Sequence, residues 1–122
     1  MARVLVADDE APMREMLRMA LELDGHEVHE AIDASTAIGL YGQVVPELLI
    51  LDLNMPGGGG ESVIKQLHAA GQRICPTVIV TGYIAELSPE MRAVMPRYRV
   101  VEKPFQLGSF QLAIREVLFG VL

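Results

Sequence analysis

The sequence has one cysteine, few basic residues and no long apolar run. The single cysteine, Cys75, cannot form a disulfide within the chain, which is typical of proteins from a reducing compartment. Because it precedes Pro76 beside an expected strand, we interpret it as a small apolar residue near the core. No apolar run reaches the roughly 20 residues of a membrane-spanning helix, and we recognise no signal peptide before the first expected strand. We therefore predict a cytoplasmic protein that has no contact with a membrane.

Positive charge is also scarce. Ten Lys and Arg residues stand against 16 Asp and Glu residues, which gives a formal net charge of −6. Nucleic acids and anionic membranes bind basic surfaces, so the composition argues against direct binding to either. The chain of 122 residues has room for one domain, and its hydrophobic fraction of 51% is ample for a core. We predict a single domain over residues 1–122.

Two patterns that often mark binding sites are incomplete. The glycine run at 57–60 is not followed by Gly-Lys-Ser or Gly-Lys-Thr, so it does not predict a phosphate-binding loop of that type. We interpret it as a mobile loop. His26, His29 and His68 lack the spacing of metal ligands and are expected on the surface.

What the chain does have is a regular alternation of strand and helix patterns. Apolar runs typical of buried parallel strands, and one shorter strand, are expected at residues 3–7, 28–31, 48–51, 77–80 and 99–102. Helical patterns follow at 12–24, 34–41, 63–70, 88–95 and 107–121. The methionines of the first helix are expected in the core. Five strand–helix units predict an α/β fold in which helices cover both faces of a parallel sheet.

Polar residues stand where these strands end. Asp8 and Asp9 follow the first strand, Asp52 the third, Thr81 the fourth and Lys103 the fifth. In an open α/β sheet, ligands bind beyond the carboxyl ends of the strands. We therefore expect these side chains to form one site.

Three carboxylates placed together repel one another unless a cation is present. Mg²⁺ prefers oxygen ligands and often shares its shell between carboxylates and phosphate oxygens. With Mg²⁺ and the Lys103 ammonium, the three carboxylates form a site without net formal charge. An aspartate in such a site can act as the nucleophile that forms an aspartyl phosphate, while the Thr81 hydroxyl donates a hydrogen bond to the phosphoryl group. Catalysis would then consist mainly of positioning and charge stabilisation.

With these residues in this order, the chain resembles a known family, the receiver domain of two-component response regulators. The matching motifs, in the order and spacing of that family, are Asp8-Asp9, Asp52 within Leu51-Asp52-Leu53-Asn54-Met55-Pro56, Gly60, Thr81-Gly82 and Lys103-Pro104-Phe105. The resemblance covers essentially the whole chain. It implies a flavodoxin-like, doubly wound sheet of five parallel strands in the order 2-1-3-4-5, with five helices.

The resemblance also implies roles for individual residues. Asp52 corresponds to the phosphoacceptor, Thr81 to the switch hydroxyl and Lys103 to the phosphate-binding lysine, which the family places before a cis proline. The metal ligands for Mg²⁺ or Mn²⁺ correspond to Asp9, Asp52 and the backbone carbonyl of Asn54, and Asp8 would hold a metal-bound water. The family has an aromatic residue three positions before the lysine, where this chain has Val100.

The implied function is that of a phosphorylation-activated signalling switch or phosphorelay element. A sensor histidine kinase or a phosphotransfer protein would donate the phosphoryl group, and a downstream protein would be the target. The domain would assist only its own phosphorylation and dephosphorylation, so we do not expect a turnover enzyme. We expect a monomer or a weak dimer. The sequence identifies neither the kinase nor the output.

Two other classes of protein were compared with this pattern. A haloacid-dehalogenase-like phosphatase also uses Mg²⁺ and an aspartate at a strand end, but its second aspartate corresponds to Asn54 here. Such an enzyme would turn over a phosphate ester many times, whereas a receiver takes one phosphoryl group per chain. A flavodoxin that binds FMN is disfavoured because the clustered carboxylates would repel the FMN phosphate.

Overall fold

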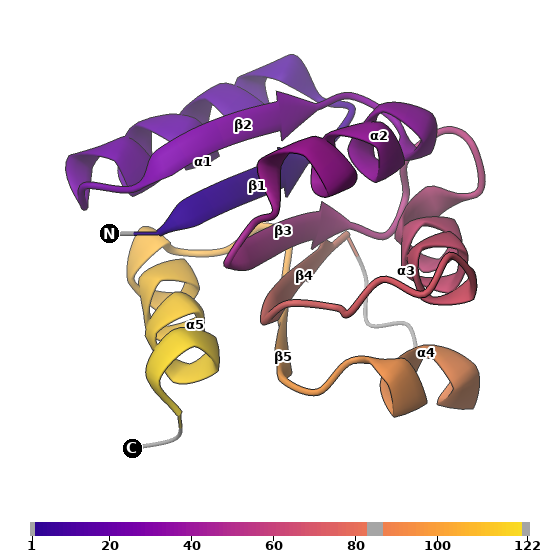
Figure 1. Cartoon of the computed structure of the whole chain (residues 1–122). Coiled ribbons are helices and arrows are strands. Elements are labelled where there is room, and N and C mark those ends of the chain that lie inside the picture. The colour runs from indigo at the N-terminus through magenta and orange to yellow at the C-terminus, as the bar shows by residue number, and fades with distance from the viewer. Residues whose placement is uncertain (1, 83–86, 121–122) are drawn as a thin grey trace.

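The computed structural model of the chain describes residues 2–82 and 87–120. Strands and helices alternate along the described chain, as Figure 1 shows. The strands are β1 (Arg3–Ala7), β2 (Glu27–Ala31), β3 (Leu48–Asp52), β4 (Thr77–Thr81) and β5 (Tyr98–Glu102). The helices are α1 (Ala11–Leu23), α2 (Ala34–Val44), α3 (Gly59–Ala69), α4 (Pro89–Val94) and α5 (Leu107–Phe119). No helix in these residues is long and apolar enough to cross a membrane.

All five strands are parallel, and their order in the sheet is β2-β1-β3-β4-β5. This confirms the doubly wound, flavodoxin-like sheet with five helices. The residues of β3 and β4 are all buried, whereas β2 and β5 form the edges, and each of them has one buried residue among half-buried and exposed ones. Ala7 pairs with Leu51, which pairs with Ile79, so the central strands end close together. That common end is the edge of the sheet where the polar residues gather.

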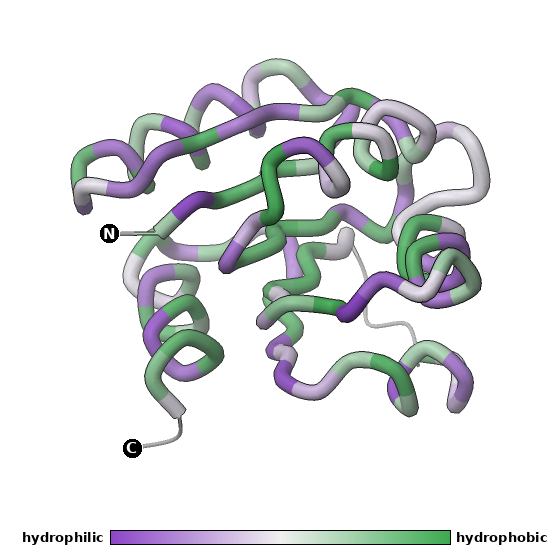
Figure 2. The backbone as a smooth tube through the Cα atoms, viewed as in Figure 1, coloured by the Kyte–Doolittle hydropathy of each residue, from purple (hydrophilic) through white to green (hydrophobic). Residues whose placement is uncertain are grey.

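Each face of the sheet carries its own apolar layer. Side chains alternate between the two faces along a strand, so Leu5 contributes to one layer and Val4 and Val6 to the other. The first layer packs against α2, α3 and α4, and its larger members include Tyr41, Leu49, Ile64, Leu67, Ile79 and Met91. The second packs against α1 and α5, and its larger members include Leu17, Leu21, Ile50, Phe110, Ile114 and Val117. Figure 2 shows the central strands as the hydrophobic middle of the molecule.

The helix limits follow from local capping chemistry. The Asp33 carboxylate accepts a hydrogen bond from the Thr36 N–H at 2.8 Å and caps α2, and the Ser88 hydroxyl caps α4 at 3.2 Å in the same way. Helix α4 has only six residues, as Pro89 and Pro96 predict. Helix α2 continues to Val44, beyond the expected end at Tyr41, because packing overrides the weak helix preference of its glycines.

The expectation that the α1 methionines belong to the core is wrong in part. Met13 packs partly against the core, but Met16 is 43% exposed and Met19 is 54% exposed. Leu17, Ala20 and Leu21 already fill the buried side of the helix. Apolar residues therefore extend beyond the stripe that faces the sheet.

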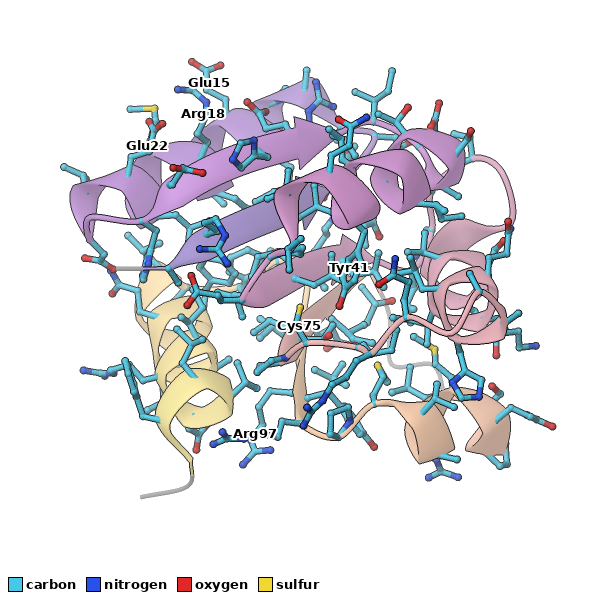
Figure 3. All side chains as sticks on the ribbon, viewed as in Figure 1. Glu15, Arg18, Glu22, Tyr41, Cys75 and Arg97 are labelled. Carbon is cyan, nitrogen blue, oxygen red and sulfur yellow. The ribbon has the colours of Figure 1, made fainter. Side chains whose placement is uncertain are left out.

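A buried tyrosine fixes the loop between α3 and β4. The Tyr41 hydroxyl donates a hydrogen bond to the Arg73 carbonyl at 2.7 Å and accepts one from the Cys75 N–H at 2.8 Å (Figure 3). Burial raises the pKa of Tyr41 above its usual value and raises the pKa of the Cys75 thiol to about 11. Cys75 therefore stays protonated at neutral pH and packs against the core, which agrees with its interpretation as a small apolar residue.

A close approach of two backbones positions the start of α3 behind the site. Gly60 lies where an added Cβ would come within 2.8 Å of the Asp52 carbonyl oxygen and 2.9 Å of Leu51 Cγ. Its N–H donates to the Leu53 carbonyl at 3.1 Å. Gly59 has a φ of +72°, a conformation that residues with a side chain rarely adopt. The two glycines thus let α3 begin directly against the end of β3.

We expect Gly60→Ala to lower the free energy of unfolding by about 1–3 kcal/mol, because the added methyl group must push apart well-packed backbone atoms. Gly39→Ala is the matched control. Gly39 lies within α2 with open space around its Cα, so alanine should raise the stability by about 0.5–1 kcal/mol through helix preference alone. Urea denaturation measures both. A stabilising Gly60→Ala would contradict this account of the contact.

Candidate functional site

Four of the polar residues predicted from the sequence lie at the carboxyl edge of the sheet. Asp8 follows β1, Asp52 ends β3, Thr81 ends β4 and Lys103 follows β5. Hydrogen bonds between neighbouring backbones hold their positions: Asp8 N–H donates to the Ala31 carbonyl at 3.1 Å, and Lys103 N–H donates to the Thr81 carbonyl at 2.6 Å. The structure brings Asp8, Asp52 and Lys103 into contact at this edge, and Thr81 ends the strand beside β3.

The Lys103 ammonium lies at the centre of this group. Its Nζ atom is 3.1 Å from Asp8 Oδ2, 3.1 Å from Glu10 Oε1 and 3.5 Å from Asp52 Oδ2. The peptide bond between Lys103 and Pro104 is cis, as the family resemblance implied. The lysine therefore joins the loop after β5 to the ends of β1 and β3.

Asp8 and Asp52 are held in the same way. Each uses Oδ1 to accept a hydrogen bond from the backbone N–H two residues further on, from Glu10 at 2.8 Å and from Asn54 at 3.0 Å. This side-chain turn is a common use of aspartate after a strand. In both residues Oδ2 is left to face Lys103. The turns thus aim one oxygen of each carboxylate at the same point.

Burial makes the charges at this point interact strongly. The exposed fractions of Asp8, Asp52 and Thr81 are only 1%, 3% and 1%. Burial raises the pKa of Asp8, although hydrogen bonds from the Glu10 backbone and Lys103 oppose the increase. Burial acts to lower the pKa of Lys103, but hydrogen bonds to the Glu10 and Asp8 carboxylates outweigh it, so its pKa lies above the usual value. The protonated lysine is therefore the stable form in the pocket.

The carboxylates could also hold a metal ion. Among the described residues, oxygen atoms of Asp8, Glu10 and Asp52 lie within 4.8 Å of one another. Together with Lys103 they leave an excess of two negative charges at neutral pH. Oxygen ligands and an excess of two negative charges suit a hard divalent ion such as Mg²⁺ or Mn²⁺. The residues present therefore fit the metal that the sequence predicted.

Not every predicted ligand belongs to this group. Asp9 is exposed and lies outside the three-carboxylate cluster, and Asn54 is also exposed. Glu10 was not singled out from the sequence. Its position directly after Asp8-Asp9 was the available signal, since a side chain there can reach the same edge of the sheet. The ligand roles of Asp9 and Asn54 remain predictions.

The other residues considered from the sequence lie elsewhere. His26 accepts a hydrogen bond from the Ala2 N–H at 3.0 Å, His29 pairs with Glu27 at 2.7 Å, and His68 is exposed on α3. Val100, which replaces the family's aromatic residue, is 44% exposed on β5. None of these four residues contributes an atom to the carboxylate cluster in the described structure.

We expect Asp8→Asn to raise the free energy of unfolding at neutral pH in metal-free buffer, because the folded state disfavours the ionised carboxyl. The pKa of Asp8 is higher in the folded state than its usual value of 3.8, which applies to the unfolded state. The folded state therefore loses stability as the pH rises from 3.8 through the raised pKa. The gain should therefore be largest near pH 7 and vanish at about pH 4 and below. Urea denaturation across this range measures it.

Asp24→Asn is the control for that experiment, since Asp24 is exposed at the end of α1 and far along the chain from the pocket. Its substitution changes the net charge by the same amount. A gain for Asp8→Asn that stays equal from about pH 4 to about pH 7 would show that ionisation of the buried carboxyl has no cost.

Comparison with known proteins adds an independent line of argument. The model of the response regulator receiver domain family matches residues 4–115. The chain is 32% identical over 117 residues to the regulatory protein AtoC of Escherichia coli, covering 95% of this chain and 25% of that protein. It is 34% identical over 119 residues to the KDP operon transcriptional regulatory protein KdpE of Escherichia coli, covering 97% of this chain and 52% of that protein. The chain thus spans between about a quarter and about half of these relatives.

Solved structures agree. The chemotaxis protein CheY4 of Vibrio cholerae superposes with a TM-score of 0.81 at 28% identity, over 97% of this chain and 99% of that chain. NtrX of Brucella abortus superposes with a TM-score of 0.78 at 26% identity, over 96% of this chain and 26% of that chain. These matches give no support to the haloacid-dehalogenase-like phosphatase. The chain belongs to the response regulator receiver domains, the phosphorylation-activated signalling switches of two-component systems.

Proposed function

We propose that Asp52 is the residue that accepts the phosphoryl group, and that residues 1–122 form one receiver domain. The observation that carries this proposal is the convergence of the buried Asp8 and Asp52 carboxylates on the Lys103 ammonium at the carboxyl edge of the sheet. Asp52 ends the central strand β3, and its Oδ2 faces the lysine while Oδ1 is fixed by the Asn54 N–H. Asp52 therefore directs one carboxylate oxygen toward the ammonium that would compensate the charge of an arriving phosphoryl group.

The proposed reaction transfers a phosphoryl group from a histidine nitrogen to an Asp52 carboxylate oxygen. An Asp52 carboxylate oxygen attacks the phosphorus of a phosphohistidine, a P–O bond forms, and the P–N bond breaks with its electron pair left on the histidine nitrogen. Lys103 neutralises charge on the phosphoryl oxygens as they arrive. Thr81 lies at the end of β4, next to β3 in the sheet, and in this proposal its hydroxyl donates a hydrogen bond to one of those oxygens.

Mg²⁺, or Mn²⁺, is the proposed cofactor and would neutralise negative charge on the phosphoryl group when bound. Asp9, Asp52 and the Asn54 carbonyl would hold it directly, and Asp8 would hold it through water. The carboxylate cluster of Asp8, Glu10 and Asp52 supports a cation at this edge. The chain assists only its own phosphorylation and dephosphorylation in this proposal.

The proposed donor is a sensor histidine kinase or a phosphotransfer protein, in the cytoplasm, and the proposed target is a downstream protein. Two relatives bear the names of transcriptional regulators of the phosphate regulon and the KDP operon. For this chain the output is a separate question, because it spans 35% and 52% of those proteins. The net charge of −6 argues against nucleic-acid binding by the domain itself. The proposed state is a monomer or a weak dimer.

We expect acetyl phosphate and Mg²⁺ to add one phosphoryl group to the wild-type chain and none to Asp52→Ala, as measured by intact mass. Asp24→Asn should accept the group as the wild type does. Addition of the group to Asp52→Ala would show that another residue is the acceptor. Repeated turnover of a phosphate ester, with no mass change in the protein, would instead favour a phosphatase.

We expect Mg²⁺ to stabilise the fold, because a bound cation relieves repulsion among the carboxylates. At a concentration 100-fold above its Kd the gain should be about 2.7 kcal/mol. Asp9→Ala and Asp52→Ala should each raise the Kd for Mg²⁺, and Asp24→Asn should leave it unchanged. Calorimetric titration with thermal denaturation measures both quantities. Equal affinity in the wild type and Asp9→Ala would remove Asp9 from the ligand set.

A further inference from the structure

The carboxylate contacts of Lys103 use all the hydrogen-bond donors of its ammonium group. An ammonium has three N–H donors, and in this structure it has three carboxylate partners, Asp8, Glu10 and Asp52. Only 13% of the Lys103 side chain is exposed. The donors are therefore fully used before any phosphoryl oxygen arrives, and at least one partner must be given up for the lysine to bind phosphate.

The three partners are not equivalent. The side chains of Asp8 and Asp52 are 2% and 4% exposed, whereas the Glu10 side chain is 62% exposed. In the proposed function, Asp52 becomes the phosphoryl carrier and Asp8 holds a metal-bound water, so both are needed elsewhere. Among the described residues, Lys103 is the only hydrogen-bond partner of the Glu10 carboxylate. Of the three partners, only Glu10 can keep its hydrogen bond to Lys103 during phosphoryl transfer.

The backbone of Glu10 is fixed on both sides. Its N–H donates to Asp8 Oδ1 at 2.8 Å, and its carbonyl accepts from the Arg14 N–H at 3.0 Å. It occupies the N-cap position of α1, yet its side chain makes no capping hydrogen bond. Serine, threonine, aspartate and asparagine are preferred there for capping, and the glutamate side chain accepts no hydrogen bond at the helix start. Its carboxylate is instead held beside the ammonium.

We propose that Glu10 is a positioning residue that keeps the Lys103 ammonium inside the pocket when Asp8 and Asp52 turn to the metal and the phosphoryl group. This inference rests on the proposed function of the same site. Without Glu10, the long lysine side chain would regain its rotamer freedom at the moment it is needed. Because the Glu10 carboxylate stays largely in water, its attraction for the ammonium is screened, and it can hold the ammonium near the phosphoryl oxygens without preventing contact with them.

The test compares Glu10→Gln with Glu15→Gln, which removes one charge from the exposed outer side of α1 (Figure 3). At saturating Mg²⁺, Glu10→Gln should slow phosphoryl uptake from acetyl phosphate roughly two- to five-fold, the effect of an ion pair whose carboxylate is screened by water. Glu15→Gln should leave the rate unchanged. An unchanged rate in Glu10→Gln would overturn the proposal.

Two further measurements do not depend on phosphorylation. The ¹H–¹⁵N signal of the Lys103 ammonium, visible when hydrogen bonds slow proton exchange, should persist in the Mg²⁺-bound wild type and in Glu15→Gln but disappear in Glu10→Gln. The Mg²⁺ Kd of Glu10→Gln should change by less than about three-fold, since a screened neighbouring charge has a small effect. Weakening by about ten-fold or more would make Glu10 part of the metal shell and would overturn the positioning role, as would an unchanged ammonium signal.

These readouts distinguish a failure of the proposed function from a failure of the positioning role of Glu10. If the wild type takes up no phosphoryl group but the ammonium signal depends on Glu10 as expected, the proposed function fails while the positioning contact stands. If Asp52 is phosphorylated and both the rate and the signal ignore Glu10, the function stands and this inference fails.

Discussion

The site depends on the compensation of buried negative charge by a single ammonium. Asp8 and Asp52 lie almost wholly out of water, and two carboxylates so placed would cost the fold several kcal/mol without an opposite charge. Lys103 supplies that charge from a loop more than fifty residues away in the sequence, and its hydrogen bonds tie the loop after β5 to the ends of β1 and β3. The compensation is incomplete, because an excess of two negative charges remains. The same imbalance that lowers the stability of the fold makes the site receptive to a divalent cation.

The rest of the fold places these few side chains at one edge. Parallel strands bring their carboxyl ends together, and the two apolar layers hold the strands in register. Side-chain turns at Asp8 and Asp52 then fix one carboxylate oxygen of each and direct the other. Gly60 allows α3 to begin against the end of β3 without displacing it. Local backbone geometry at the strand ends therefore shapes the pocket, whereas apolar packing, which does not involve the pocket, holds the strands in place.

Much of this could be predicted from the sequence. The central strands are short apolar runs bounded by polar residues, and their limits agree with the structure to within one residue because burial on both faces leaves little ambiguity. Asp8, Asp52, Thr81 and Lys103 were found because each directly follows or ends a strand. Glu10 was missed because its position after Asp8-Asp9 shows only that its side chain can reach this edge, whereas its contact depends on where Lys103 lies. Met16 and Met19 were misplaced because helical periodicity does not fix how wide the buried stripe is.

The two edge strands differ from the central ones in a way that limits how the sheet can grow. An edge strand presents unpaired backbone groups to any other chain that meets it. In β2 the charged residues Glu27 and Glu30 break the apolar pattern, and in β5 Arg99 and Glu102 do the same. Several of these charges are engaged with neighbours: His29 pairs with Glu27, and Arg99 with Glu116 on α5. A second molecule that approached either edge to add a strand would have to desolvate those charges, so the sequence that closes the sheet at five strands also protects it against aggregation.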